Sequence, residues 1–252
     1  MTDAAPPDGP AGSPLLPPPP PPLHLHARAV PWQHAFAWFE DGMRLFKRAP
    51  WAWLGLGFCT LAVELAASAV PEVGPLLAQV VAPLVAGGMA FAAAAADRGA
   101  APSLRYAVAA FGAPARALVA VVAANLVAFA GEALAAWFVA GVNLLAPGDG
   151  SDLSVAAIVG MVALGVLASL PVLFVPFHAL LERAPPVAAF GASFSAFALN
   201  TLPLLVYGAT ALVLIGLGAA TMGLGLLLAL PLLATAGYAA WKDIFGVRDA
   251  PE

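Results

Sequence analysis

Charged residues are scarce in this sequence. Only 10% of its 252 residues are Asp, Glu, Lys or Arg, whereas 62% are apolar; soluble proteins average about 25% charged residues. Water is therefore not the main solvent of this chain. The long uncharged stretches instead predict several membrane-spanning helices, because about 20 apolar residues at 1.5 Å each cross a hydrocarbon core of roughly 30 Å.

Cysteine and catalytic motifs are also nearly or wholly missing. Cys59 is the only cysteine, so no disulfide can form within the chain. The sequence contains no nucleophile elbow, Walker loop, zinc-protease helix or dinucleotide fingerprint, and no dense basic surface for nucleic acid. His178 and Glu182, four residues apart, would supply half of a metal site, but no second pair of ligands accompanies them. We therefore expect no enzyme, no metal, no cofactor and no nucleic-acid partner.

The N-terminal residues lack the features of a signal peptide. Residues 1–23 contain no Lys or Arg and no apolar core of about 7 to 15 residues. The run Pro17–Pro22 favours polyproline II. We predict a disordered, proline-rich cytoplasmic arm over residues 1–30, a membrane domain over 31–247 and a polar tail over 248–252.

The segment 32–48 is amphipathic and precedes the first long apolar run. Its polar side carries Glu40, Arg44 and Lys47, and its apolar side places Phe36, Phe39 and Phe46 at the depth of the lipid headgroups. This pattern predicts a helix that lies in the plane of the membrane surface. The apolar runs after it predict six spans, at about 50–70, 76–96, 117–142, 153–181 and, with a turn near 219–223, two within 202–240.

Three features recur in the same order and predict an internal repeat. An apolar triplet with spacings of four and three residues precedes each pair of spans, and a proline lies 11 to 14 residues before a charged pair at the end of each even-numbered span. The predicted fold is thus an all-α membrane bundle of six transmembrane helices, built from three repeats of equal orientation. Each repeat comprises an interfacial amphipathic helix and a helix pair. The repeats span about residues 31–98, 103–183 and 185–245.

The distribution of basic residues predicts the orientation. All ten Lys and Arg residues fall at the N-terminus, after spans two and four, or at the C-terminus. Under the positive-inside rule both termini then face the cytoplasm and the number of spans is even. Near that surface, basic side chains attract anionic lipid at about 1 kcal/mol each. The candidate lipid contacts are Arg44, Lys47, Arg48, Arg105 and Arg116.

Two carboxyl groups interrupt the apolar runs. Glu64 and Glu132 lie within spans one and three, and an ionisable group at membrane depth is a candidate functional group. One interpretation is a proton or cation site that includes Asn125 and Gln79. The other is structural: Glu64 reaches the outer interface and Glu132 bonds a neighbouring helix. The sequence leaves both open.

The segments WFEDGMRLFKRAPWAWLGL and YAAWKDIFG, with the mid-helix prolines of the even-numbered spans, resemble a family of uncharacterised proteobacterial inner-membrane proteins with six transmembrane helices. The resemblance covers about residues 30–247 and implies a multi-pass protein of the bacterial inner membrane, without an assigned activity. We expect a non-enzymatic protein that organises membrane, interacts with lipid or assembles with another membrane protein. The alternative is a small transporter or channel that uses Glu64 and Glu132.

Overall fold

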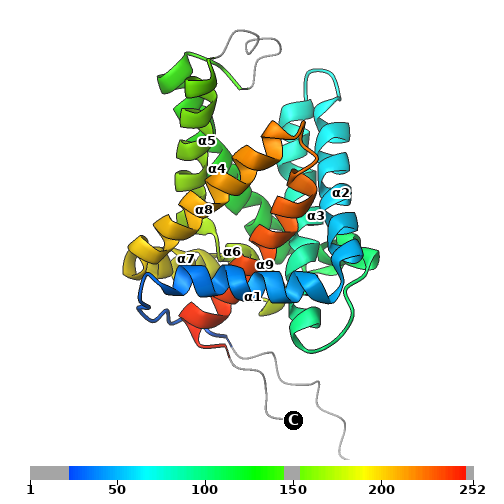
Figure 1. Ribbon diagram of the computed structural model, residues 1–252, viewed down its shortest axis with the longest axis vertical. Coiled ribbons are helices and arrows are strands. Elements are labelled where there is room, and N and C mark those ends of the chain that lie inside the picture. Colours follow the sequence, from blue (N-terminus) through cyan, green and yellow to red (C-terminus); the bar gives the residue numbers. More distant parts are fainter. Residues whose placement is uncertain (1–22, 145–153, 248–252) are drawn as a thin grey trace, which may run out of the picture.

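The computed structural model describes residues 23–144 and 154–247, whose regular secondary structure is all helical (Figure 1). The proline-rich run 17–22, most of the predicted loop 144–152 and the polar tail lie outside the described residues. The elements are α1 (His34–Arg48), α2 (Pro50–Ser68), α3 (Gly74–Asp97), the 3-10 helix η1 (Leu104–Gly112), α4 (Ala115–Ala140), α5 (Val155–Ser169), the 3-10 turn η2 (Leu170–Val172), α6 (Val175–Leu181), α7 (Pro186–Leu199), α8 (Thr201–Ala220) and α9 (Leu226–Phe245).

Among residues 23–144 and 154–247, five segments are long and apolar enough to cross a membrane. They are α2, α3, residues 115–139 of α4, residues 155–172 and α8. The chain is therefore an all-helical bundle of the membrane-spanning class. Helix α9 has 20 residues but is not among the five, and its last turns carry Lys242 and Asp243.

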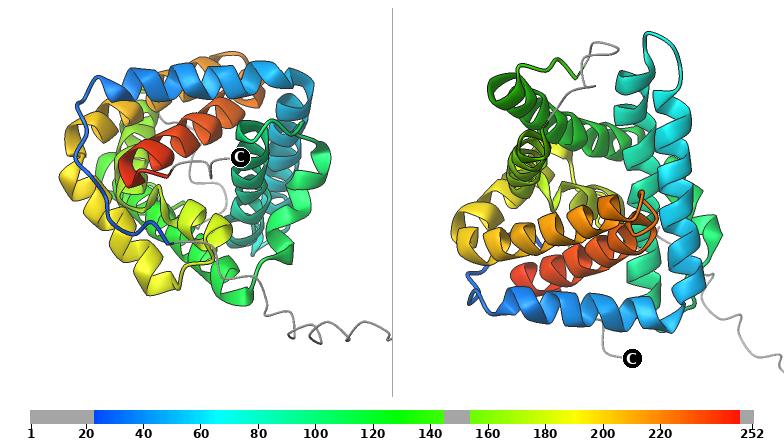
Figure 2. Two further views of the ribbon diagram at one scale, coloured as in Figure 1. Left: turned by 90° about the horizontal axis from the view of Figure 1, so that it is seen from below. Right: turned by 45° about the horizontal axis from the view of Figure 1, so that its top comes forward.

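The short helices α1, η1 and α7 lie at one end of the bundle, together with the last turns of α3 and α9 and both ends of the described chain (Figure 1). We call this the basal end. Seen from below, α1, α7 and η1 lie along three sides of it (Figure 2, left). The α2–α3 turn and the end of α4 lie at the opposite end (Figure 1). The basal end thus combines the three segments that the sequence predicts to lie at a membrane surface.

Helix α1 packs on α9 through a face that the sequence did not predict. Trp38 is 2% exposed, and its Nε1 donates to Oδ2 of Asp243 at 2.9 Å. Phe46, predicted to lie among lipid headgroups, is only 8% exposed, and the Phe39 ring stacks on Tyr207 with centroids 5.3 Å apart. The predicted headgroup position is therefore wrong for Phe46, because that side of α1 contacts the bundle.

The fourth predicted span is broken at its prolines. Pro171 and Pro176 have no N–H for the helical ladder, and the helix changes there from α5 through η2 to α6. Ser193 of α7 bridges the break: its Oγ donates to the Pro171 carbonyl at 2.8 Å and accepts from the Phe174 N–H at 3.2 Å. The kink that the sequence predicts is confirmed, and Ser193 of another helix, α7, supplies hydrogen-bond partners to the backbone at the kink.

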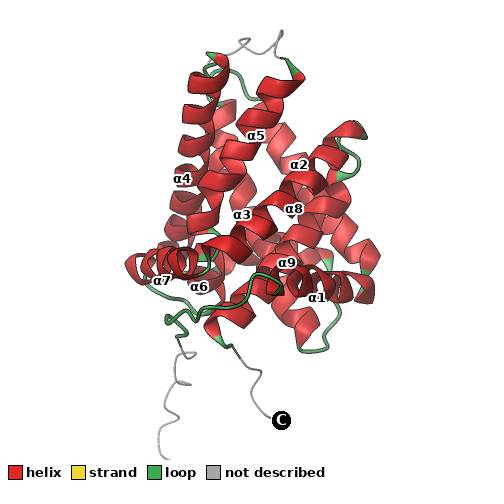
Figure 3. Cartoon of the chain, turned by 60° about the vertical axis from the view of Figure 1, so that its left-hand side comes forward, coloured by secondary structure: helices red, strands yellow, loops and turns green. Residues whose placement is uncertain are grey.

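An extended N-terminal segment, residues 24–31, runs across the basal end as a loop (Figure 3). The side chain of Asn200, 1% exposed, accepts from the Val30 N–H at 2.8 Å and donates to the Arg28 carbonyl at 3.0 Å. The Arg28 guanidinium binds Asp243 at 2.6 Å. Residues 24–30 therefore belong to the bundle and not, as the sequence suggested, to the disordered arm.

Candidate functional site

The site begins with a proline inside α3. Pro83 has no N–H, so the carbonyl of Gln79, four residues earlier, loses its helical partner. An unsatisfied carbonyl at membrane depth costs several kcal/mol. Asn125 of α4 supplies the missing donor: its Nδ2 lies 3.1 Å from the Gln79 carbonyl and 2.7 Å from Gln79 Oε1. The two amide side chains therefore join α3 to α4 and repair the break in the helical ladder.

Gln79 and Asn125 line a cavity of about 330 Å³ between α3, α4, α5 and α8. Glu132 lines it from α4 and Ser169 from the end of α5. Gly165 of α5 makes room for the Glu132 side chain, because a Cβ there would lie only 3.2 Å from Glu132 Cγ. Four polar side chains from three helices thus meet at one open cavity. The other lining residues are Ala128, Phe129, Val162, Gly165, Val166 and Ile215.

A second, predominantly apolar cavity of about 320 Å³ adjoins the first. Asn125, Ala128 and Ser169 line both cavities and form their shared wall. The second cavity extends toward α6 and α9. Its apolar residues include Val121, Val172, Leu173, Phe177, Leu233 and Ala234. Together, the two cavities present a polar half and an apolar half.

The structure brings together three of the four intramembrane residues singled out in the sequence. Gln79, Asn125 and Glu132 line the polar cavity, whereas Glu64 of α2 lines neither cavity. The carboxyl groups of Glu64 and Glu132 are nevertheless close enough to interact electrostatically. Sequence reasoning missed Ser169. Its only signal was its position, a hydroxyl two residues before the helix-breaking Pro171.

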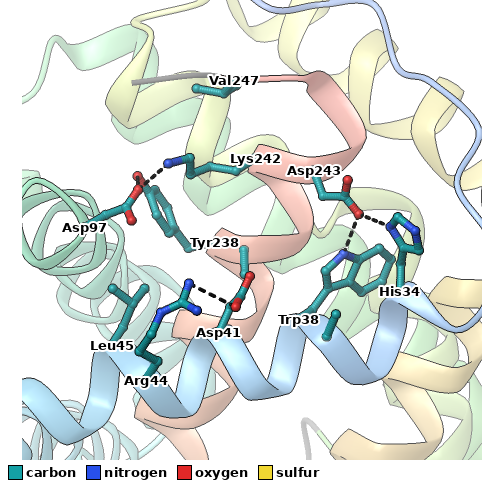
Figure 4. A pocket seen from close by; sticks show the side chains of 12 residues that line it. His34, Trp38, Asp41, Arg44, Leu45, Asp97, Tyr238, Lys242, Asp243 and Val247 are labelled. Atoms are coloured by element: carbon teal, nitrogen blue, oxygen red, sulfur yellow. Dashed lines mark hydrogen bonds and ion pairs between the residues drawn. The ribbon is translucent and has the colours of Figure 1, made fainter. Parts of the chain in front are cut away.

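A separate pocket of about 380 Å³ opens at the basal end, between α1, α9 and the end of α3 (Figure 4). Its charges are paired: Asp41 binds Arg44 at 3.0 Å, Asp97 binds Lys242, and Asp243 binds His34 at 2.7 Å. Burial by itself raises the pKa of the Asp243 carboxyl, but hydrogen bonds from His34, Trp38 and Arg28 outweigh it and hold the pKa below its ordinary value. The Asp243–His34 and Asp97–Lys242 pairs hold α1 and α3 to α9, whereas Asp41–Arg44 lies within α1.

The five candidate lipid contacts belong to basal elements, and most have protein partners. Arg48 donates to the Ala96 carbonyl near the end of α3, and Arg116 donates to the Arg183 carbonyl at 3.3 Å. The Arg105 guanidinium lies 5.4 Å from the centroid of the Tyr106 ring. Arg44 pairs with Asp41 but has a side chain 65% exposed, and Lys47 is exposed. All five side chains are exposed, and Arg44 and Lys47 lie on the same helix, α1.

In the predicted half-site, Glu182 binds both His178 and the N-terminal residue His24. Glu182 is 5% exposed, and its two carboxylate oxygens bond Nδ1 of His178 and Nδ1 of His24, each at 2.7 Å. It also accepts from the His24 N–H at 3.0 Å. Burial by itself raises the pKa of the Glu182 carboxyl, but the hydrogen bonds with His178 and His24 lower it by a larger amount. The pKa therefore lies below its ordinary value. Within residues 23–144 and 154–247, no group of three His, Cys, Asp or Glu side chains could hold a metal ion.

Fold and site together define a helical membrane bundle with two adjoining open cavities, one polar and one predominantly apolar. Comparisons of the chain with protein-family models, curated proteins and solved structures found no match.

Proposed function

We propose that this chain is a six-span protein of the bacterial inner membrane with both termini in the cytoplasm. It acts without catalysis, by binding lipid, including anionic lipid, and by assembling with another membrane protein. The observation that carries this proposal is a hollow of about 500 Å³ on α1. Phe39 and Met43 line it beside Glu40, Arg44 and Lys47. Apolar and basic groups side by side suit the acyl and headgroup parts of an anionic lipid.

The order of the elements supports six spans and three repeats. A short helix at the basal end precedes two longer helices in each case: α1 with α2 and α3, η1 with α4 and α5, and α7 with α8 and α9. Helix α9 returns from the turn at 221–225 to the basal end (Figure 1). As the sixth span, α9 would contribute its 20 residues, Leu226–Phe245, with Lys242 and Asp243 at the membrane surface.

Exposed side chains support the placement in the membrane. At the basal end, Trp51, Val108 and Val187 are 83%, 65% and 86% exposed, and at the end of α4 Trp137 and Phe138 are 59% and 81% exposed. Aromatic residues gather at both interfaces of membrane proteins. The described Lys and Arg residues all lie in or beside basal elements, which supports a cytoplasmic position for that end.

The lipid contact can be tested by removing charge from the α1 hollow. The Arg44→Gln/Lys47→Gln double variant should lose about 1 kcal/mol per charge, or about 25-fold in combined affinity for phosphatidylglycerol. Native mass spectrometry of lipid adducts, compared with phosphatidylcholine, measures this loss. Glu40→Gln on the same helix serves as the control and should bind phosphatidylglycerol more tightly, because a negative charge is removed. Equal adducts in all three proteins would contradict a lipid site on α1.

The topology can be tested with reporter fusions. Fusions after Gly74 and Met222 should report the outside, and fusions after Gly99 and Arg183 the cytoplasm. A cytoplasmic signal after Met222 would remove α8 and α9 as a membrane pair and with them the third repeat.

A small transporter or channel that uses Glu64 and Glu132 is the second candidate. The polar cavity between α3, α4, α5 and α8 favours it, because transport sites are built from polar groups at membrane depth. Solute flux in proteoliposomes that disappears in the Glu64→Gln/Glu132→Gln variant would establish this function. A parent protein without flux for a broad panel of ions and solutes would exclude it.

A further inference from the structure

We propose that the two adjoining cavities form one binding site for an amphiphilic amine, a molecule with an apolar body and a protonated amino group. The proposal rests on the placement of the chain in the membrane but not on the lipid contact at α1. The apolar body would occupy the cavity lined by Phe177 and Leu233, and the amino group would lie beside Glu132.

The volumes and walls of the cavities match an elongated amphiphile. Ligand cavities usually measure about 300 to 1,000 Å³ and are lined mainly by apolar side chains with a few polar groups that orient the ligand. The cavities of about 320 and 330 Å³ adjoin at Asn125, Ala128 and Ser169, and an elongated amphiphile that passes these side chains would occupy both. A bare ion would use only the polar half.

Hydrogen-bond accounting shows which polar groups remain for a ligand. Asn125 Nδ2 already donates to two oxygens of Gln79, which leaves Asn125 Oδ1 as an acceptor. Ser169 Oγ donates to the Val166 carbonyl at 2.7 Å and keeps its lone pairs. Among the described residues, Glu132 has neither a hydrogen bond nor an ion pair, so both of its oxygens remain available. Acceptors therefore outnumber donors, and Gln79 Nε2 is the remaining side-chain donor.

The charge of the residues that line the two cavities favours a cationic ligand over a neutral hydrogen-bond donor. Glu132 is the only charged residue among the described residues that line the two cavities, and neither cavity contains Lys or Arg. Glu64 adds a second carboxyl group within electrostatic range of Glu132. A protonated amine supplies both the positive charge and the N–H donors that this wall lacks, and charge-assisted hydrogen bonds are roughly twice as strong as neutral ones.

The proposal can be tested by photo-crosslinking of the whole protein in lipid nanodiscs. The probe is a primary alkylamine with a diazirine in its alkyl chain, and the matched probe is the alcohol of the same chain. We expect the amine to label peptides of the apolar cavity, such as those with Phe177 and Leu233, at least tenfold more than the alcohol does. Equal labelling by the two probes would overturn the proposal.

Three variants localise the site. Glu132→Gln should reduce amine labelling at least tenfold. Ala128→Leu places a larger side chain where the two cavities adjoin, without changing the charge, and should reduce labelling to a similar extent. Glu40→Gln on α1 should leave it unchanged. Size-exclusion profiles verify that each variant is folded; should Glu132→Gln not fold, Ala128→Leu decides alone. Unchanged amine labelling in Ala128→Leu, or in folded Glu132→Gln, overturns the proposed amine site. If Arg44→Gln/Lys47→Gln loses its lipid adducts but keeps its amine labelling, only the lipid contact on α1 is affected.

Discussion

Replacing Gly88 by alanine should strongly destabilise the bundle. Gly88 lies in α3, where a Cβ would come within 1.9 Å of the Tyr106 carbonyl oxygen and 2.8 Å of its carbon. Both atoms are backbone of η1, so a rotamer change cannot relieve the clash and η1 must move away from α3. Overpacking of this kind typically costs about 1 to 3 kcal/mol and occasionally more. We expect a loss above about 3 kcal/mol, measured as lower resistance to denaturant or heat in detergent.

Gly191→Ala provides the matched control. Gly191 also lies in a helix, α7, but a Cβ there meets nothing within 4 Å. Alanine stabilises a helix interior by about 0.5 to 1 kcal/mol relative to glycine, so this variant should be slightly more stable than the parent. If the two variants have the same stability, η1 does not pack on α3 as the structure has it.

Replacing Glu182 by leucine should release the N-terminal segment and destabilise the basal end. The substitution removes the acceptor shared by His178 and His24, and His178 is fully buried with its Nε2 already unpartnered. Leaving a buried donor without its acceptor costs about 1 to 3 kcal/mol. Amide hydrogen exchange of residues 24–31 measures the release, and denaturant unfolding measures the loss of stability.

Glu182→Gln is the conservative companion variant, because it keeps the shape of the side chain and one acceptor oxygen. It should fall between the parent and Glu182→Leu in both measurements. Exchange at residues 24–31 that is equally slow in the parent and in Glu182→Leu would show that Asn200 and Asp243 alone hold the segment.

The carboxyl groups that hold the N-terminal segment, Glu182 and Asp243, make its attachment sensitive to acid. The pKa values of Glu182 and Asp243 are lowered in the folded protein, so their contribution to stability is complete above their ordinary values of 4.5 and 3.8. It is lost as the pH falls through the lower folded values. The protection factors of the amides at residues 24–31 should therefore fall below about pH 4.5, and Glu182→Gln should weaken this pH dependence.

Much of the helical framework follows from the sequence alone. The predicted spans at 50–70 and 76–96 correspond to α2 at 50–68 and α3 at 74–97, and the predicted turn near 219–223 falls at 221–225. Local chemistry explains this agreement: uncharged runs mark segments that avoid water, and proline and glycine end helices wherever they fold. Pro171 and Pro176 broke the fourth run for the same reason.

Only the tertiary structure decided which apolar surface meets protein. On α1, the sequence favoured Phe39 and Phe46 for the lipid, yet Phe46 is buried, and the buried Trp38 had no place on the predicted face. In a membrane protein the side toward lipid and the side toward other helices are both apolar, so hydrophobic periodicity does not distinguish them. Burial therefore depends on which helices the fold brings together.

The candidate site shows the same division. The sequence by itself identified Glu132, Asn125 and Gln79, because polar groups stand out in apolar runs. It did not reveal that Asn125 binds the carbonyl that Pro83 leaves free, that Ser169 joins the same cavity, or that Glu64 lies outside it. Each of these facts depends on a contact between helices distant in sequence, and such contacts are fixed by packing and not by local propensity.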